Sequence, residues 1–335
     1  MKQVTLLIEE TSTYNSMIDI MFGDLLSEKK IIKILENKSN AKIENILKKN
    51  KIEKKFGKIT GQILYKKFRL YEFLRDNAHK YDRINILFLN SSFIQTRYPL
   101  YSLKKYKKKF KNLRYILFYI DIINHPVCQY ANYLRRKGIF DSIYTVDEDD
   151  AKKYNLKLWK TPYSKYEKFV NKVVKKDIYF CGVLKERDKK IKKILDGCKK
   201  NKIIADLDIV CNEKETEPLL TYKEFINFHM PDDYLNYLEV LKNSLEANCI
   251  LEIVQDGQKA LTLRPYEAVA YNKKLLTNNK TILDFEFYDS RYMKYYEKES
   301  DIDWEWVKRK EKVHYSYNNE FSPIHLLRNI EKEFL

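Results

Sequence analysis

The sequence predicts an α/β fold built from two Rossmann-like, doubly wound domains. Short apolar runs that end in small or polar residues alternate with longer helical segments, as expected of buried parallel strands joined by helices. This alternation pauses near residue 170 and then begins again. Because 335 residues also exceed the usual size of one domain, we expect two domains, residues 1–168 and residues 169–335.

The first half contains four predicted strands, each followed by helical sequence. VTLLIEE precedes the helical pattern SMIDIMFGDLL, and about 50 Lys-rich residues of helical character come next. The runs INILFLNSS and LRYILFYIDIINHP repeat the design. FDSIYTVDEDDAKKYNL does so once more, with the acidic cluster DEDD capping its helix. The strands therefore begin within residues 4–10, 84–92, 113–126 and 140–156.

The second half repeats the alternation of strand and helix. KDIYFCGVLKERDKKIKKILDGCKKN predicts a strand, a Gly turn and a basic helix, and ADLDIVCNE predicts a second strand. LTYKEFINFHMPDDYLNYLEVLKNS is helical in character, and ANCILEIVQDG is a third strand. PYEAVAYN follows as a helix with Pro265 in its first turn, and KKLLTNN is a short strand. These elements lie within residues 176–201, 205–213, 220–244, 247–257, 265–272 and 273–279.

Composition excludes several classes of protein. A hydrophobic fraction of 44% with 14% aromatic residues excludes a disordered chain. The five cysteines have no CxxC spacing, so they indicate neither a zinc site nor a disulfide framework but reduced thiols in the cytoplasm. The N-terminal apolar run is too short for a signal peptide, and no apolar run approaches the roughly 18 residues of a spanning helix. We therefore expect a cytoplasmic protein, soluble or peripheral at the inner face of the cell membrane.

The excess of positive over negative charge is confined to the first half. Residues 1–170 contain 35 Lys and Arg against 18 Asp and Glu, whereas the remaining residues contain 29 of each. The runs KKNKIEKK and KKYKKK supply much of the excess. Such runs form solvated helix faces, dock on an anionic membrane surface, or bind a polyanionic nucleic acid.

Candidate binding residues follow the predicted strands of the second half. Open α/β sheets bind ligands beyond the carboxyl ends of their strands. Gly182 permits a turn after the first of these strands, and Lys185 and Arg187 lie at the mouth of the next helix, where a phosphate would be stabilised. Gly182 and two cations are a weak signal by themselves.

A second set follows the strand within residues 247–257. Thr262 and Arg264 directly precede the helix that Pro265 begins, and Arg264 could bind a diphosphate through two hydrogen bonds. Glu267, in the first turn, could accept hydrogen bonds from sugar hydroxyls, or could be an ordinary helix-start acid with Arg264 as its neighbour. The polar residues that end the next strand could line the same site: Thr277, Asn278 and Asn279.

These motifs resemble a known family. SLEANCILEIVQDGQKALTLRPYEAVAYNKKLLTNN is similar to the nucleotide-sugar-binding segment of bacterial GT-B glycosyltransferases of the lipopolysaccharide or capsular polysaccharide biosynthesis kind. FDSIYTVDEDDAKKYNL resembles their last N-domain strand and helix, and IYFCGVLKERDKKI resembles the opening of their donor domain. FSPIHLLRNIEKEF resembles the helix that closes such chains. The similarity spans roughly residues 110–335.

The resemblance implies two Rossmann-like domains facing across a cleft. The N-terminal domain would receive a glycan or lipid-linked acceptor, and the C-terminal domain would hold a nucleoside diphosphate-sugar. By position, Lys185, Arg187, Thr262 and Arg264 would lie near the diphosphate, and Glu267 would take ribose or sugar hydroxyls. One position departs from the family: many retaining members have a second glutamate where this chain has Lys259, so that retaining pattern is not supported.

The resemblance further implies a hexosyl transfer that requires no cofactor and no metal. If the reaction inverts, a base must deprotonate the acceptor, and Asp121 and His125, after the strand within residues 113–126, are the candidates. Either could equally cap a helix or lie on the surface. No DxD motif stands at a strand end, since DEDD is explained as a helix cap. A cationic N-terminal domain would suit acceptors carried on a lipid diphosphate in an anionic membrane.

Other functions stay open at this stage. A related GT-B enzyme, such as an epimerase or a polyol-phosphate transferase, would share the nucleotide site. A basic nucleic-acid-binding protein would account for the charge, but the sequence contains no zinc-finger, RNP-type or recognition-helix signature, so no nucleic-acid partner is expected. A catalytically inactive partner subunit would account for the low glycine content and for Lys259.

Overall fold

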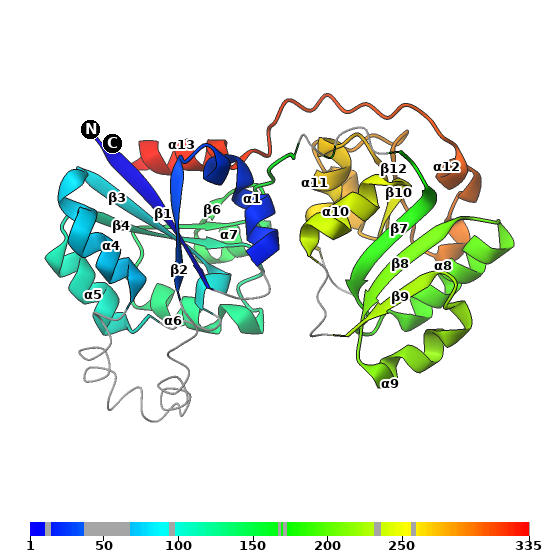
Figure 1. The fold of residues 1–335 in the computed structure, drawn as a ribbon, viewed down its shortest axis with the longest axis horizontal. Helices are drawn as coiled ribbons and strands as arrows, with labels where there is room; N and C mark the ends of the chain where they lie inside the picture. The colour runs from blue at the N-terminus through cyan, green and yellow to red at the C-terminus, as the bar shows by residue number, and fades with distance from the viewer. Residues whose placement is uncertain are drawn as a thin grey trace. The chain divides into compact units, whose positions relative to one another are not determined.

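The structure is a computed structural model that describes residues 1–10, 15–36, 68–93, 98–166, 169, 173–230, 236–255 and 259–334. The chain forms two compact units, each with its own sheet (Figure 1). The first comprises Met1–Pro162 together with Ser322–Leu335, and the second comprises Tyr163–Phe321. The backbone N–H of Tyr163 donates to the carbonyl of Phe321 (2.8 Å), so the two ends of the second unit lie side by side.

The described part of the first unit contains a sheet of six parallel strands in the order β2-β1-β3-β4-β5-β6. Consecutive side chains alternate between its faces. Leu6 and Ile8 pack in the core under α4, α5 and α6, whereas Leu7 packs in the core under α1 and α13. The strands are β1 (Gln3–Glu10), β2 (Ile31–Glu36), β3 (Arg83–Leu89), β4 (Leu113–Tyr119), β5 (Ser142–Thr145) and β6 (Lys157–Leu158). The helices are α1 (Asn15–Ser27), α4 (Arg69–Asn77), α5 (Leu100–Lys109), α6 (Gln129–Arg136), α7 (Glu148–Tyr154) and α13 (Pro323–Glu333).

The last helix, α13, belongs to the first unit, although the sequence-based division put its residues with the second. Ser322 begins the helix, and its hydroxyl donates to Asp24 on α1 (2.9 Å). At the other end Glu333 pairs with Lys157 and accepts from the hydroxyl of Tyr144 (2.5 Å). The apolar face of α13 completes the core over α1, which explains why the chain returns to the first unit.

The second unit has the same architecture. Its described part contains six parallel strands in the order β12-β11-β10-β7-β8-β9. Helices α8 and α12 pack on one face, and α10 packs on the other over Tyr179. The strands are β7 (Lys176–Val183), β8 (Ala205–Val210), β9 (Ile226–His229), β10 (Ala247–Glu252), β11 (Lys274–Thr277) and β12 (Met293–Tyr295). The helices are α8 (Asp188–Lys200), α9 (Glu213–Thr216), α10 (Tyr237–Leu245), α11 (Leu263–Ala270) and α12 (Trp304–Lys308).

The predicted fold class, two Rossmann-like α/β domains, is therefore confirmed, with two local corrections. Ile31–Glu36 and Ile226–His229, both in stretches predicted to be helical, form the edge strands β2 and β9. Apolar runs of this length do not distinguish a strand from a helix by periodicity alone. The rest of the Lys-rich stretch, residues 37–67 with the run KKNKIEKK, lies outside the described residues. The acidic cap is confirmed, since Asp147 accepts from the backbone N–H of Asp150 (2.8 Å) at the start of α7.

Candidate functional site

The candidate site lies at the carboxyl ends of β7, β10 and β11 and at the start of α11. In an open parallel sheet this edge is where ligands bind. Thr262 caps α11 by accepting from the backbone N–H of Arg264 (3.1 Å). The remaining N–H groups of the first turn supply partial positive charge there.

Glu267 is the most deeply buried acid of this region, with none of its surface exposed. Its Oε2 accepts from two donors, the hydroxyl of Tyr237 on α10 (3.0 Å) and Nη1 of Arg264 (2.6 Å). Its Oε1 is also buried, yet it has no hydrogen-bond partner among the residues that the structure describes. A bare carboxylate oxygen away from water is costly, so Oε1 requires a partner.

Arg264 is held beside this carboxylate. Its Nη1 also approaches the hydroxyl of Ser244 (3.3 Å), and its guanidinium carbon lies 5.7 Å from the ring centroid of Tyr237. Burial acts to lower the pKa of Arg264, but the charge of Glu267 reverses this, and the pKa lies above its ordinary value. Arg264 therefore keeps its positive charge beside this carboxyl group, with 13% of its side chain still exposed.

Two predicted ligand residues, Thr262 and Thr277, bond to a carboxylate that the sequence analysis missed. Both hydroxyls donate to Glu252, which is 3% exposed at the end of β10. Burial raises the pKa of Glu252 against the effect of these two hydrogen bonds. Asn278 accepts from the backbone N–H of Val254 (2.7 Å). These hydrogen bonds hold the segment that follows β10. The sequence signal that could have revealed Glu252 is an acid inside the apolar run ILEIV.

Gly182 and Arg187 also act together. A Cβ at Gly182 would lie 2.9 Å from Cζ of Phe180 and 3.0 Å from Nη2 of Arg187, so a larger residue would require the ends of these two side chains to shift. Arg187 donates to the carbonyls of Val183 and Ile253, which joins the ends of β7 and β10. Burial lowers its pKa. Arg187 therefore links the carboxyl ends of two central strands, a role that the sequence did not predict.

Lys185 is the exposed cation of this turn. Its backbone has φ = 45°, in the left-handed region that favours glycine, so the turn holds a non-glycine residue in an uncommon conformation. Because Arg187 is bonded to backbone carbonyls, Lys185 is the predicted phosphate-binding side chain that solvent reaches most freely.

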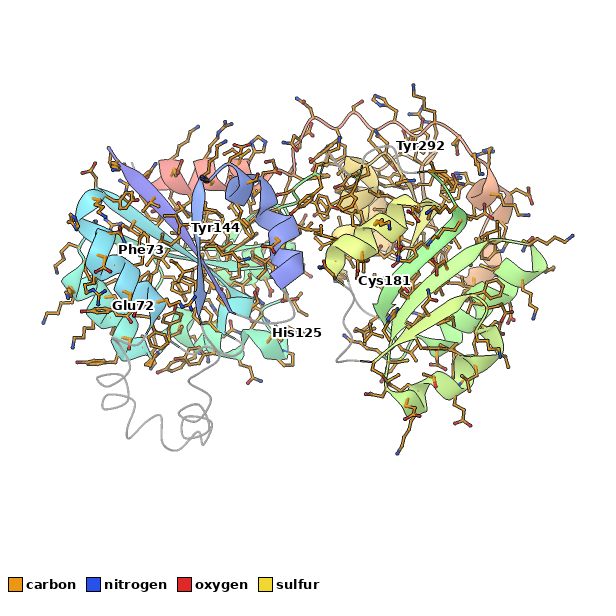
Figure 2. The ribbon with its side chains drawn as sticks, viewed as in Figure 1. Glu72, Phe73, His125, Tyr144, Cys181 and Tyr292 are labelled. Carbon is orange, nitrogen blue, oxygen red and sulfur yellow. The ribbon has the colours of Figure 1, made fainter. Side chains whose placement is uncertain are left out.

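A second polar cluster, also missed, surrounds Asp208 on β8. Asp208 accepts from the hydroxyl of Tyr179 (2.5 Å) and from Nδ2 of Asn243 (3.3 Å), and its Oδ1 lies 2.9 Å from Nε2 of His229. Burial would raise its pKa, but the hydrogen bonds from Tyr179 and His229 lower it below the ordinary value. The neighbouring thiol of Cys181 (Figure 2) has its pKa raised by burial to about 11, with Arg264 opposing the shift.

The candidate bases belong to the first unit and follow β4. Asp121 accepts from Nδ2 of Asn90 (2.8 Å), and Oδ1 of the same asparagine accepts from the backbone N–H of Ile120 (2.7 Å). His125 is exposed (Figure 2), and its Nδ1 accepts a long hydrogen bond from the N–H of Val127 (3.4 Å). The two side chains thus have different local partners. In the described ranges no group of three or more His, Cys, Asp or Glu side chains is placed to hold a metal ion.

Comparison with known proteins shows similarity in structure. No protein-family model and no curated protein matches the sequence. HepE from Anabaena, solved in complex with UDP and glucose, superposes with a TM-score of 0.53 and 9% identity over 100% of this chain and 99% of its own. An α-glucosyltransferase in complex with UDP and a 13-mer DNA does so with a TM-score of 0.52 and 12% identity, over 92% and 90%. The chain spans 47% of TarM, at a TM-score of 0.44 and 10% identity over 67% of this chain. The likeness to the first two shows that the fold is of the GT-B type.

Proposed function

We propose that the chain is a glycosyltransferase that moves a hexosyl group from a nucleoside diphosphate-sugar to a glycan or lipid-linked acceptor of surface-polysaccharide assembly. The observation that supports this most is the bare, buried Oε1 of Glu267 beside the ionised Arg264, at the start of α11. A carboxylate oxygen accepts sugar hydroxyls, and a cation beside a helix N-terminus attracts phosphate. The two structural neighbours, one solved with UDP and glucose and the other with UDP and DNA, favour the same donor class.

The proposed division of labour follows from the contacts. The first turn of α11, Arg264 and the exposed Lys185 bind the diphosphate, and Glu267 binds a hydroxyl of the ribose or of the transferred sugar. Asp121 and His125 are the proposed bases of the first unit if the reaction inverts. Lys and Arg side chains with the helix dipole balance the phosphate charge, so the proposed reaction requires no metal.

Thermal unfolding with UDP, GDP, CDP and dTDP tests the donor site. A nucleotide at 100 times its dissociation constant should stabilise the protein by about 2.7 kcal/mol. Arg264→Ala should abolish this stabilisation and Lys185→Ala should weaken it, whereas Lys189→Ala, which removes an exposed lysine of α8, should leave it unchanged. Stabilisation by none of the four nucleotides, or stabilisation that survives Arg264→Ala, would rule the site out.

A nucleic-acid acceptor is the second candidate, and one observation favours it. Residues 99–139, which include α5 and α6, contain ten Lys and Arg and a single acid, Asp121. One structural neighbour is a glucosyltransferase solved with DNA. Incubation with UDP-glucose and either double-stranded DNA or a polyprenyl diphosphate-linked sugar separates the two acceptors by which product gains a hexose.

A further inference from the structure

The carboxylate of Glu267 is held asymmetrically. Tyr237 and Arg264, on two different helices, both donate to Oε2, and neither donates to Oε1. Both oxygens of a carboxylate can accept hydrogen bonds, and a bidentate contact with one arginine would use both. This arrangement instead leaves one buried oxygen bare.

Tyr237 is well suited to impose this asymmetry. Asn236 caps α10 by accepting from the N–H of Leu238 (2.9 Å), which fixes the backbone at Tyr237. Burial raises the pKa of Tyr237 well above its ordinary value, with Glu267 adding to the shift, so its hydroxyl keeps its proton and remains a donor. Arg264 could pivot about its long side chain, whereas the tyrosine has only two side-chain torsions.

We infer that Tyr237 is a positioning residue of the donor site. With Arg264 it holds Oε2 of Glu267 and so reserves Oε1 for a hydroxyl group of the bound nucleotide-sugar. This inference rests on the proposed function, and it adds a residue that acts on the ligand only through Glu267. The competing occupant of Oε1 is a buried water molecule, which would give Tyr237 a purely structural role.

The test compares ligands that differ by one hydroxyl. Dissociation constants are measured for UDP against 2′-deoxy-UDP, and for UDP-glucose against its 2-deoxyglucose analogue. Wild type should prefer the hydroxylated member of one pair by about tenfold or more, as expected for a hydrogen bond to a charged acceptor. Tyr237→Phe should reduce that preference at least about threefold while the deoxy ligand binds as before.

The matched control is Tyr296→Phe. It makes the same change in the same unit, at a buried hydroxyl that has no hydrogen-bond partner in the described part of the chain, so the preference should be unchanged. If Tyr237→Phe does not fold, Ser244→Ala loosens Arg264 instead and should lower the same preference. The inference is overturned if Tyr237→Phe, or Ser244→Ala in its place, leaves the preference at the wild-type value. It is also overturned if wild type shows no preference in either ligand pair. Failure of every nucleotide to bind overturns the proposed function itself.

Discussion

Two buried carboxyl groups of the second unit have pKa values that are shifted in opposite directions. Glu252 accepts from the hydroxyls of Thr262 and Thr277, and its pKa is raised because burial outweighs these and the other stabilising contacts. Asp208 accepts from Tyr179, Asn243 and His229, and its pKa is lowered. The number and kind of donors therefore decide which acid carries its charge easily.

Because of this difference, the two residues contribute to the free energy of unfolding with opposite dependences on pH. Glu252 has a folded-state pKa above its ordinary value, so it contributes stability in acid that is lost as pH rises through that pKa. Asp208 has a lowered pKa, so it contributes stability above its ordinary value that is lost as pH falls through the folded-state pKa. Urea unfolding from about pH 3 to about pH 7 checks this against Glu252→Gln and Asp208→Asn. The free energy of unfolding of wild type should exceed that of Glu252→Gln by less as pH rises. It should exceed that of Asp208→Asn by less as pH falls. If wild type and either variant lose or gain stability in parallel across this range, the assignment for that residue is wrong.

At the scale of elements, α13 contributes to the core of the first unit. It is far along the chain from the strands it covers, yet Leu326, Leu327 and Ile330 are nearly fully buried against α1 and the sheet. The contacts of Ser322 and Glu333 fix its two ends. The helix is therefore part of the core of this unit and not a loose tail.

Leu326→Ala should destabilise the first unit by about 2–5 kcal/mol, because it removes buried methyl groups and leaves a cavity. His325→Ala changes the exposed neighbour and should alter the unfolding free energy by no more than about 0.5 kcal/mol. Chemical denaturation followed by tryptophan and tyrosine fluorescence measures both. An equal effect of the two substitutions would show that α13 does not pack as described.

The sequence predicted the buried central strands well, because β3 and β4 contain the apolar runs 86–89 and 115–119, followed closely by polar residues. It missed β2 and β9, which lie at sheet edges where a short run fits either period. For the candidate site it pointed to the residues at the start of α11, which stays a prediction. It could not show that the hydroxyls of Thr262 and Thr277 donate to Glu252, or that Arg187 donates to backbone carbonyls. Those partners come from separate strands and helix starts, and no local sequence pattern records which of them meet in the fold.

At the scale of the whole molecule, charge is distributed unequally along the chain. The excess of Lys and Arg lies in residues 1–170, and α5 with α6 carries a run of exposed cations without nearby acids in sequence. In the described residues no helix is both long and apolar enough to cross a bilayer. We propose that the basic first half attracts anionic membranes, where each cation contributes about 1 kcal/mol.

Co-sedimentation with vesicles tests this proposal. Binding to phosphatidylglycerol vesicles should exceed binding to phosphatidylcholine vesicles and should weaken with added salt. Lys104→Glu/Lys108→Glu on α5 should reduce it at least about tenfold, whereas Lys189→Glu/Lys200→Glu on α8 should change it little. Binding that is insensitive to salt, or equally weakened by both double variants, would count against a surface on the first half.

The side-by-side ends of the second unit, Tyr163 and Phe321, have an evolutionary consequence. They make residues 163–321 an insertion within the first unit, whose own chain ends at Pro162 and resumes at Ser322. Because the entry and exit of the insertion meet, a module of this kind can be exchanged as one cassette without separating α13 from the sheet it covers. Recombination at these two positions would replace the proposed donor half while leaving the proposed acceptor half intact.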